Sequence, residues 1–259
     1  MTTNESSPDI QTYRRGHVAI VAMRRAPHNF LEPGLLAALA HEFEALDDDN
    51  SCRAVVLASD VKSFCAGADF ASRDPSTKPD PAAFYRQALR LFRTRKPIVA
   101  AVQGAAVGAG VGLALAADFR VTCPEARFSV NFNRLGFHPG FGLSLTLPRL
   151  IGQQHAAMLF YTGSRIDGVR AVDIGLADQL CNTIDDVREQ AISLATDIAA
   201  SAPLAVESTR ATLRANLADL LHQSNQRELQ EQAIQFATAD FREGVAAMAA
   251  RRLPVFQKR

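Results

Sequence analysis

The sequence predicts an α/β fold whose C-terminal part is a layer of helices. Two observations predict it. In the first two-thirds of the 259 residues, short apolar runs typical of buried strands alternate with helical patterns, which favours a sheet covered by helices. After Gly140 helical periodicity dominates. We expect a core at residues 1–200 and a helical C-terminal region at residues 201–259.

The expected elements follow one another in a regular order. Strands are predicted at residues 17–22, 53–59, 98–102, 118–122 and 128–130. Helices are predicted at residues 33–46, 81–93, 111–117, 185–200, 204–217, 219–237 and 242–252. Leucines and Phe43 share one face of the first helix, and Pro81 suits the first turn of the second. Residues 72–81 are rich in Pro, Asp, Ser and Lys, which predicts a mobile loop.

Two turns of small residues are the most informative feature. Residues 64–69 (FCAGAD) and residues 103–112 (QGAAVGAGVG) each follow a predicted strand. Backbone N–H groups in such turns can approach a ligand closely, and a helix start favours an anion. Close helix–strand packing would explain one such turn, but two of them favour a site that holds one developing negative charge. Each donor of this kind contributes about 3–4 kcal/mol to the transition state.

The glycine-rich segment does not fit a nucleotide-binding motif. Leu113 stands where the third small residue of a dinucleotide fingerprint belongs, and no acidic residue follows at the expected distance. The segment also lacks the Lys-Ser/Thr pair of a phosphate-binding loop. If the two turns instead hold one developing negative charge, the chemistry passes through an oxyanion, and the expected substrate is an acyl group with an activatable carbonyl.

Composition excludes several other classes. The formal charge of +1 gives no field that would attract nucleic acid or a membrane. The N-terminus lacks the features of a signal or transit peptide, and the apolar stretch at residues 105–117 is too short to span a bilayer. Four widely spaced cysteines show no zinc-binding pattern and fit a cytoplasmic protein. Cys65 has no neighbouring base, so we expect a buried structural thiol.

On these motifs the chain resembles the enoyl-CoA hydratase/isomerase (crotonase) superfamily. The resemblance runs from about His17 to Phe256 and is strongest at residues 53–69, 96–104, 117–118 and 135–140. It implies a spiral of ββα units, a C-terminal region that forms homotrimers or dimers of trimers, and an acyl-CoA thioester as substrate. Coenzyme A is then part of the substrate, and no separate cofactor or metal is expected.

The resemblance also assigns roles to single residues. The N–H groups of Ala68 and Ala109 would hold the oxyanion, with Gly108 beside them. Residues near the CoA moiety would be Arg25, Ala26, Ala66, Asp69 and Phe70. For Asp69 a helix cap or turn hydrogen bond is the preferred role, and Asp118 and Glu125 are interpreted as structural.

The chain departs from the family at its proton-transfer positions. The two glutamates of the family's hydratases fall at Gly112 and Phe132, and the carboxylate of some isomerases falls at Gly140. Neither glycine nor phenylalanine can move a proton, and losing a general base costs roughly 10²–10⁴-fold in rate. His138 is one titratable substitute, although a loop histidine bonded to backbone is an equal alternative. Phe128, Phe132, Phe137 and Phe141 either wall an acyl cavity or pack in the core.

Three functions stay open at this point. The first is an acyl-CoA enzyme that works through an enolate, for which isomerisation, another proton transfer or decarboxylation is easier than hydration. The second is a non-catalytic acyl-CoA-binding protein on the same scaffold. The third is a protein whose oligomer surface recruits partners, although intact glycine turns count against it.

Overall fold

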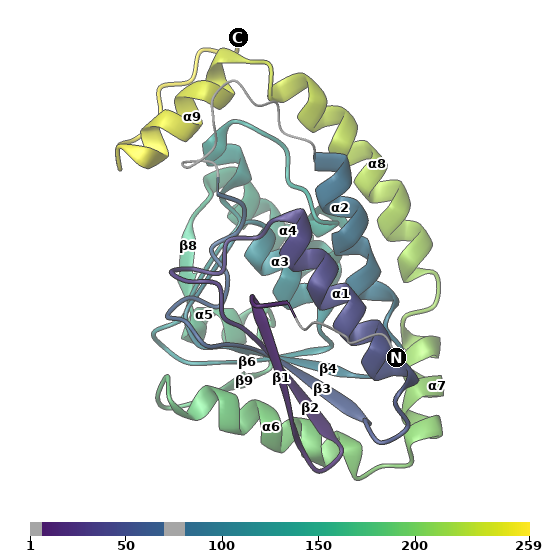
Figure 1. The fold of residues 1–259 in the computed structure, drawn as a ribbon. Coiled ribbons are helices and arrows are strands. Elements are labelled where there is room, and N and C mark those ends of the chain that lie inside the picture. Colours follow the sequence, from purple (N-terminus) through teal and green to yellow (C-terminus); the bar gives the residue numbers. More distant parts are fainter. Residues whose placement is uncertain (1–6, 70–80) are drawn as a thin grey trace.

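A large sheet organises the fold in the computed structural model, which describes residues 7–69 and 81–259 (Figure 1). Within those residues it has six strands in the order β1-β2-β3-β4-β6-β9. They are β1 (Ile10–Arg15), β2 (Val18–Met23), β3 (Ala54–Ser59), β4 (Ile98–Val102), β6 (Phe119–Thr122) and β9 (Gln179–Leu180). β1 and β2 are antiparallel, and the other neighbours are parallel. Every residue of β2, β3 and β4 is buried, as parallel strands between helices require.

A smaller sheet follows the end of β4. In the described chain it consists of β5 (Ala105–Val107), β7 (Arg127–Ser129) and β8 (Arg165–Asp167). β5 and β7 are parallel, and β7 and β8 are antiparallel. Cys65 forms a parallel bridge with Ala106, so the turn after β3 lies against the edge of this second sheet.

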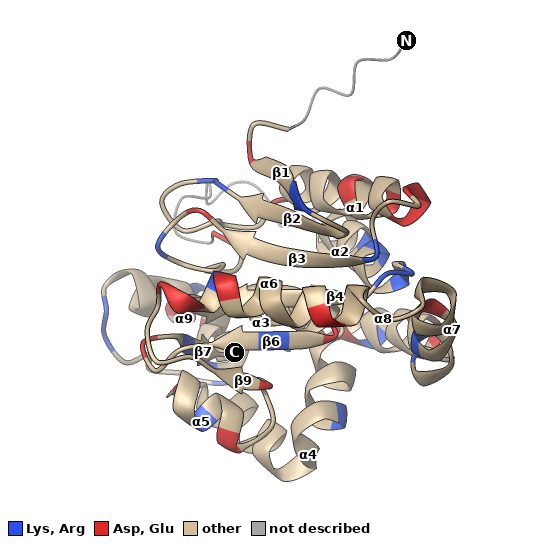
Figure 2. Cartoon of the chain, turned by 90° about the horizontal axis from the view of Figure 1, so that it is seen from below, with Lys and Arg blue, Asp and Glu red and all other residues tan. Residues whose placement is uncertain are grey.

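Helices cover both faces of the large sheet. In Figure 1, α6 (Asp186–Ala199) lies below the sheet, and α1 (Pro33–Asp48), α2 (Pro81–Arg90), α3 (Ala109–Ala116) and α4 (Leu143–Thr162) lie above it. Short helical turns are η1 (Leu91–Arg93), η2 (Asn131–Leu135) and α5 (Gly168–Asp173). Figure 2 shows the charged residues on the outer elements, whereas β2, β3 and β4 carry almost none. No helix in residues 7–69 and 81–259 combines the length and apolar character needed to cross a membrane.

The C-terminal helices are α7 (Pro203–Leu213), α8 (Leu217–Gln235) and α9 (Ala239–Ala249), and buried polar groups attach the first two to the core. The Asp118 carboxylate accepts hydrogen bonds from Arg210 on α7 and from Arg214 just after it. It also accepts one from the backbone N–H of Ile98 at the start of β4. Asp118 therefore has the structural role that the sequence predicts.

The predicted α/β class is confirmed, and most differences concern short or polar strands. β1, β5, β8 and β9 were not predicted, because β5, β8 and β9 have only two or three residues and β1 has several exposed side chains. The helix predicted at 81–93 ends at Arg90 and continues as η1, and α3 begins two residues earlier than expected. The loop expected at 72–81 lies almost wholly outside the described residues, since Pro81 already begins α2. The division at residue 200 stays a prediction.

Candidate active site

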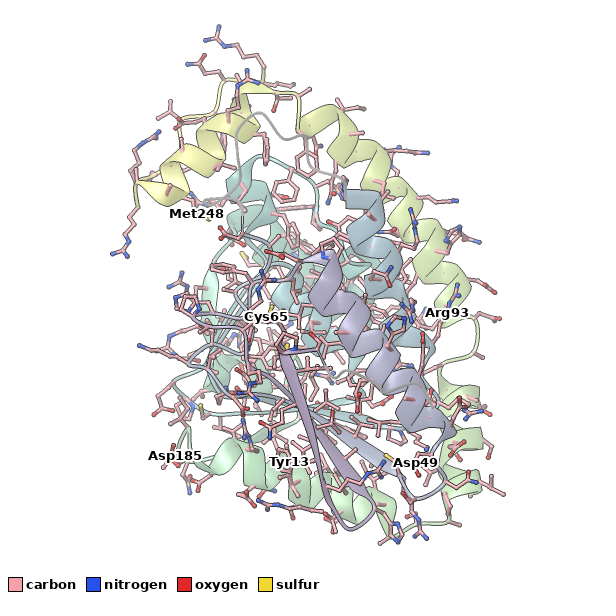
Figure 3. All side chains as sticks on the ribbon, in the orientation of Figure 1. Tyr13, Asp49, Cys65, Arg93, Asp185 and Met248 are labelled. Atoms are coloured by element: carbon pink, nitrogen blue, oxygen red, sulfur yellow. The ribbon has the colours of Figure 1, made fainter. Side chains whose placement is uncertain are left out.

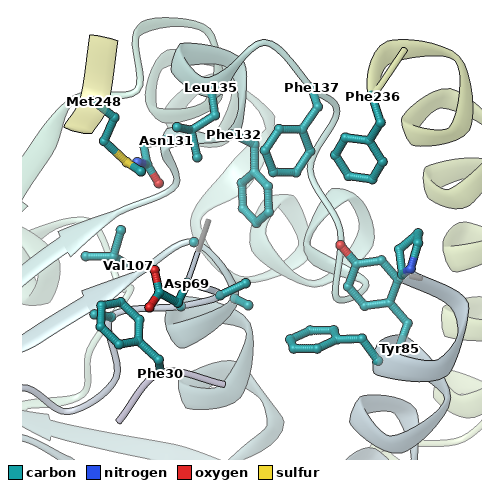
Figure 4. Close-up of a pocket in the computed structure, with 17 residues that line it drawn as sticks. Phe30, Asp69, Tyr85, Val107, Asn131, Phe132, Leu135, Phe137, Phe236 and Met248 are labelled. Atoms are coloured by element: carbon teal, nitrogen blue, oxygen red, sulfur yellow. The ribbon is translucent and has the colours of Figure 1, made fainter. Parts of the chain in front are cut away.

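A cavity of about 230 Å³ lies where the two small-residue turns meet α2, η2 and the C-terminal helices (Figure 4). Most of its wall is apolar, which suits the pocket of a small-molecule ligand. Its lining comes from Phe30, Ala66, Gly67, Ala68, Asp69, Pro81, Phe84, Tyr85, Val107, Gly108, Ala109, Asn131, Phe132, Leu135, Phe137, Phe236 and Met248.

Strand pairing holds the two turns in register. Cys65 and Ala106 are bridged as parallel partners, with hydrogen bonds from Cys65 N to Ala105 O (2.9 Å) and from Val107 N to Cys65 O (3.0 Å). Ala68 and Ala109 each lie three residues beyond a bridged residue. The parallel register therefore carries both residues to the same end of the paired segments, and both line the cavity.

Glycines allow this close approach. Gly67 has φ +81°, and a Cβ there would lie 2.5 Å from Val107 O and 3.5 Å from Ala109 N. A Cβ on Gly110 would overlap the carbonyl oxygen of Cys65. Any larger residue at either position would push the two turns apart.

The two backbone amides at the centre of this arrangement are available for a ligand. Among the described residues, neither the N–H of Ala68 nor that of Ala109 donates a hydrogen bond. Ala109 is the first residue of α3, where a helix leaves its N–H groups unpaired and its dipole favours negative charge. The arrangement can therefore accept one anionic oxygen at the apolar cavity.

The cavity brings together only part of the predicted site. Ala66, Ala68, Asp69, Gly108, Ala109 and Phe132 line it. Arg25, Ala26, Gly112, His138 and Gly140 do not. Phe70 lies outside the described residues. Of the other predicted wall residues, Phe137 lines the cavity edge-on to Phe132, whereas Phe128 and Phe141 are buried behind it.

Arg25 does not line the cavity and makes its contacts with other residues. Its guanidinium pairs with Glu32 at 2.7 Å, and the hydrogen bond to that carboxylate raises the pKa of Arg25. Its backbone N–H donates to the side chain of Asn29 (2.8 Å). The predicted contact of Arg25 with CoA stays a prediction.

His138 contacts its own loop. Its Nδ1 lies 2.8 Å from the carbonyl oxygen of Pro139, and its backbone N–H donates to Gln235 Oε1 at 2.6 Å. Because the side chain is not part of the cavity wall, these contacts favour the loop-histidine alternative over a base. A base role for His138 stays a prediction.

Neighbouring side chains fill the space beside Gly112 and Gly140. A Cβ on Gly112 would lie 2.6 Å from the ring of Phe141. A Cβ on Gly140 would overlap the hydroxyl of Tyr85 and lie 2.7 Å from Gln232 Nε2. A carboxylate at either position would therefore require rearrangement of its neighbours.

Cys65 is a buried structural thiol, as predicted. It is fully buried, and Figure 3 shows it in the interior. Burial raises its pKa to about 12. The N–H of Gly67 donates to its sulfur at 3.4 Å, so the thiol supports the turn.

Several cavity residues were not predicted, and among them Tyr85 and Met248 come from helices outside the two turns. Tyr85 lies on α2, and its hydroxyl contacts Gln232 of α8, with Gln232 Nε2 donating to it at 3.0 Å. Nothing in the local pattern marks either residue. The one signal that could have indicated Tyr85 is Gly140, since a glycine leaves room for a neighbouring side chain.

Comparisons with known proteins agree with this geometry. The sequence profile of the enoyl-CoA hydratase/isomerase family matches residues 14–259. An Arabidopsis thaliana protein named "Probable enoyl-CoA hydratase 2, mitochondrial" is 32% identical over 253 residues, which cover 93% of this chain and 81% of that protein. The 2,3-dehydroadipyl-CoA hydratase of Escherichia coli K12 is 32% identical over 252 residues, covering 95% and 97%. The crystal structure of an enoyl-CoA hydratase/isomerase from Pseudoalteromonas atlantica T6c has a TM-score of 0.85 and 29% identity, covering 96% and 100%.

Proposed function

Because the chain belongs to the enoyl-CoA hydratase/isomerase (crotonase) superfamily, whose members process acyl-CoA thioesters, we propose that it forms an enolate of such a substrate and stabilises the enolate oxygen with the N–H groups of Ala68 and Ala109. One observation carries the proposal. Two backbone amides without hydrogen-bond partners in the described chain open onto a single apolar cavity.

The mechanism follows from where charge develops. When a bond at the α-carbon breaks and leaves its electron pair behind, negative charge moves to the thioester oxygen. Fixed N–H dipoles then stabilise that oxygen by about 3–4 kcal/mol each, because an apolar wall screens them little. The start of α3 adds to this effect at Ala109.

Within the family, we propose proton transfer or decarboxylation rather than hydration. Hydration needs one group to activate water and another to protonate carbon, and the positions matched to the hydratase glutamates are Gly112 and Phe132. Decarboxylation needs only a stabilised enolate and a proton source, so the absence of these glutamates affects it least. The packing of Phe141 against Gly112 supports this choice.

The test compares three substrates in deuterated water, namely crotonyl-CoA, a 3-enoyl-CoA and methylmalonyl-CoA, with product mass as the readout. We expect turnover of the 3-enoyl or malonyl-type thioester to exceed hydration of crotonyl-CoA. Ala109→Pro removes one donor at a position where proline suits a helix, and it should lower kcat roughly 10²–10³-fold. Ala239→Pro makes the same change at the first residue of α9, outside the cavity, and is the matched control.

The second candidate is a non-catalytic acyl-CoA-binding protein, favoured by the filled space at Gly112 and Gly140. It predicts that all three thioesters bind while none is altered or exchanges deuterium. That result would overturn the enzymatic proposal. His138→Ala should leave turnover unchanged if His138 is only a loop residue.

We also propose the homotrimer or dimer of trimers and the cytoplasmic location that the resemblance and composition imply. Leu204 and Leu213 on α7 are 80% and 79% exposed, which supports a subunit contact in the C-terminal region. Light scattering of the purified protein measures the oligomeric state directly.

A further inference from the structure

The cavity offers few groups that can donate a proton. Among its described lining residues, only Asp69 and Tyr85 have ionisable side chains. A phenol always has an O–H to give, whereas a carboxyl group has one only when it is protonated. An enolate formed here must still receive a proton at carbon, so Tyr85 is the donor to consider.

Tyr85 is held at the cavity wall with its hydroxyl directed inward. The residue is 6% exposed and lies in the first half of α2, and Figure 4 shows its hydroxyl pointing into the cavity from the side opposite Asp69. Gly140 makes this position possible, because a Cβ there would overlap the hydroxyl. The chain thus has a phenol in the space where a side chain at residue 140 would lie.

Gln232 fixes the direction of the Tyr85 hydroxyl. Gln232 is fully buried on α8, and its Nε2 donates one hydrogen bond to His138 O (2.9 Å) and one to Tyr85 Oη (3.0 Å). The bond to the carbonyl fixes which end of the amide is the donor. The phenol oxygen is therefore an acceptor from Gln232 Nε2. Among the described residues, the other acceptor for its proton is Gln232 Oε1, at the longer distance of 3.2 Å. A substrate in the cavity can take that proton while the bond from Nε2 remains.

The surroundings keep the phenol protonated. Burial raises the pKa of Tyr85, although its hydrogen bond with Gln232 acts in the opposite direction. A neutral phenol near neutral pH can act as an acid, but not as a base.

We propose that the Tyr85 hydroxyl protonates the α-carbon of the enolate and that Gln232 is its positioning residue; this rests on the function proposed above. With a malonyl-type thioester, the bond to the carboxylate breaks, CO₂ leaves, and the electron pair forms the enolate. That pair then takes the Tyr85 proton in a new C–H bond. The tyrosinate regains a proton from water when the product leaves.

The experiment uses methylmalonyl-CoA in deuterated water, with CO₂ release and the stereochemistry of the deuterated propionyl-CoA as readouts. The wild type should deliver deuterium to one face of the α-carbon. Tyr85→Phe keeps the ring and should lower kcat roughly 10²–10⁴-fold with little change in KM, and its residual product should be deuterated on both faces. Tyr161→Phe, at a tyrosine that is 77% exposed on α4, is the matched control.

A second variant separates positioning from packing. Gln232→Met retains Tyr85 but removes both amide hydrogen bonds, so face selectivity should fall even where the melting temperature is kept. If Tyr85→Phe and Gln232→Met both retain rate and selectivity, the Tyr85 proposal is overturned while the enolate proposal stands. If the wild type neither releases CO₂ from methylmalonyl-CoA nor converts the 3-enoyl-CoA, both are overturned.

Discussion

The cavity has two sides that are built in different ways. On one side the proposed chemistry lies in backbone amides. Ala68 and Ala109 are held there by the strand pairing of Cys65 with Ala106, three residues before each of them. On the other side the proposed chemistry lies in side chains such as Tyr85 and Phe132, which reach the wall from α2 and η2. A backbone N–H donor remains when the side chain of its residue is replaced. The chemistry of the opposite wall, in contrast, changes whenever one of its side chains is replaced. One family can therefore keep an anion site and alter the reaction around it.

We expect the largest loss of activity from a substitution on the backbone side of the cavity. Gly110→Val places a branched side chain against the Cys65 carbonyl, so we expect the two turns to separate and enolate chemistry to be lost. Overpacking of this kind also lowers the free energy of unfolding by about 1–3 kcal/mol. Urea denaturation and turnover of methylmalonyl-CoA measure the two effects.

A second glycine gives the control for that substitution. Gly34 lies in α1 with no atom near the position of an added Cβ. Gly34→Ala should keep full activity and raise the free energy of unfolding by about 0.5–1 kcal/mol. Equal behaviour of the two variants would show that the close approach at Gly110 is not needed.

On the side-chain wall of the cavity, we do not expect a single substitution to restore hydration of crotonyl-CoA. Gly112→Glu restores a carboxylate where hydratases are expected to have one, but Phe141 occupies that space. We expect loss of about 1–3 kcal/mol of stability and no gain in hydration of crotonyl-CoA. Adding Phe141→Ala should recover part of the stability non-additively, because the two residues share one space. Strong hydration by the single variant would contradict this account of the wall.

Substitution of Glu228 should have the smallest of these effects, a change in the free energy of unfolding that depends on pH. Its buried carboxylate accepts hydrogen bonds from Gly142 N (2.8 Å) and Ser144 N (3.1 Å) at the start of α4. Burial outweighs these bonds and raises its pKa above the unfolded value of about 4.3. Between those two pKa values the folded state binds more protons, so stability falls as pH rises.

Glu228→Gln should remove that pH dependence. The free energy of unfolding of the wild type, compared with that of the variant, should decrease as pH rises from 4 to 7. Glu231→Gln, at a half-buried glutamate of the same helix, is the control. A wild type that gains stability over the Glu228 variant across this range would show that the hydrogen bonds outweigh burial.

The two sides also differ in how far the sequence predicts them. The strands and the glycine turns are each encoded by a short segment of sequence. The periodicity of the strands predicted the fold class, and the small residues of the turns indicated Ala68 and Ala109. Tyr85 and Gln232 are 147 residues apart and meet only when α2 packs on α8, which no local pattern encodes. β1 was missed because it is a polar edge strand, and its residues alternate poorly between buried and exposed.

The most direct test of the central claim is a crystal structure with a bound acyl-CoA thioester or a stable enolate analogue. We predict that one oxygen of the acyl group lies about 2.7–3.1 Å from both Ala68 N and Ala109 N. A thioester oxygen that binds elsewhere in the cavity while both amides remain unused would contradict the proposed oxyanion site.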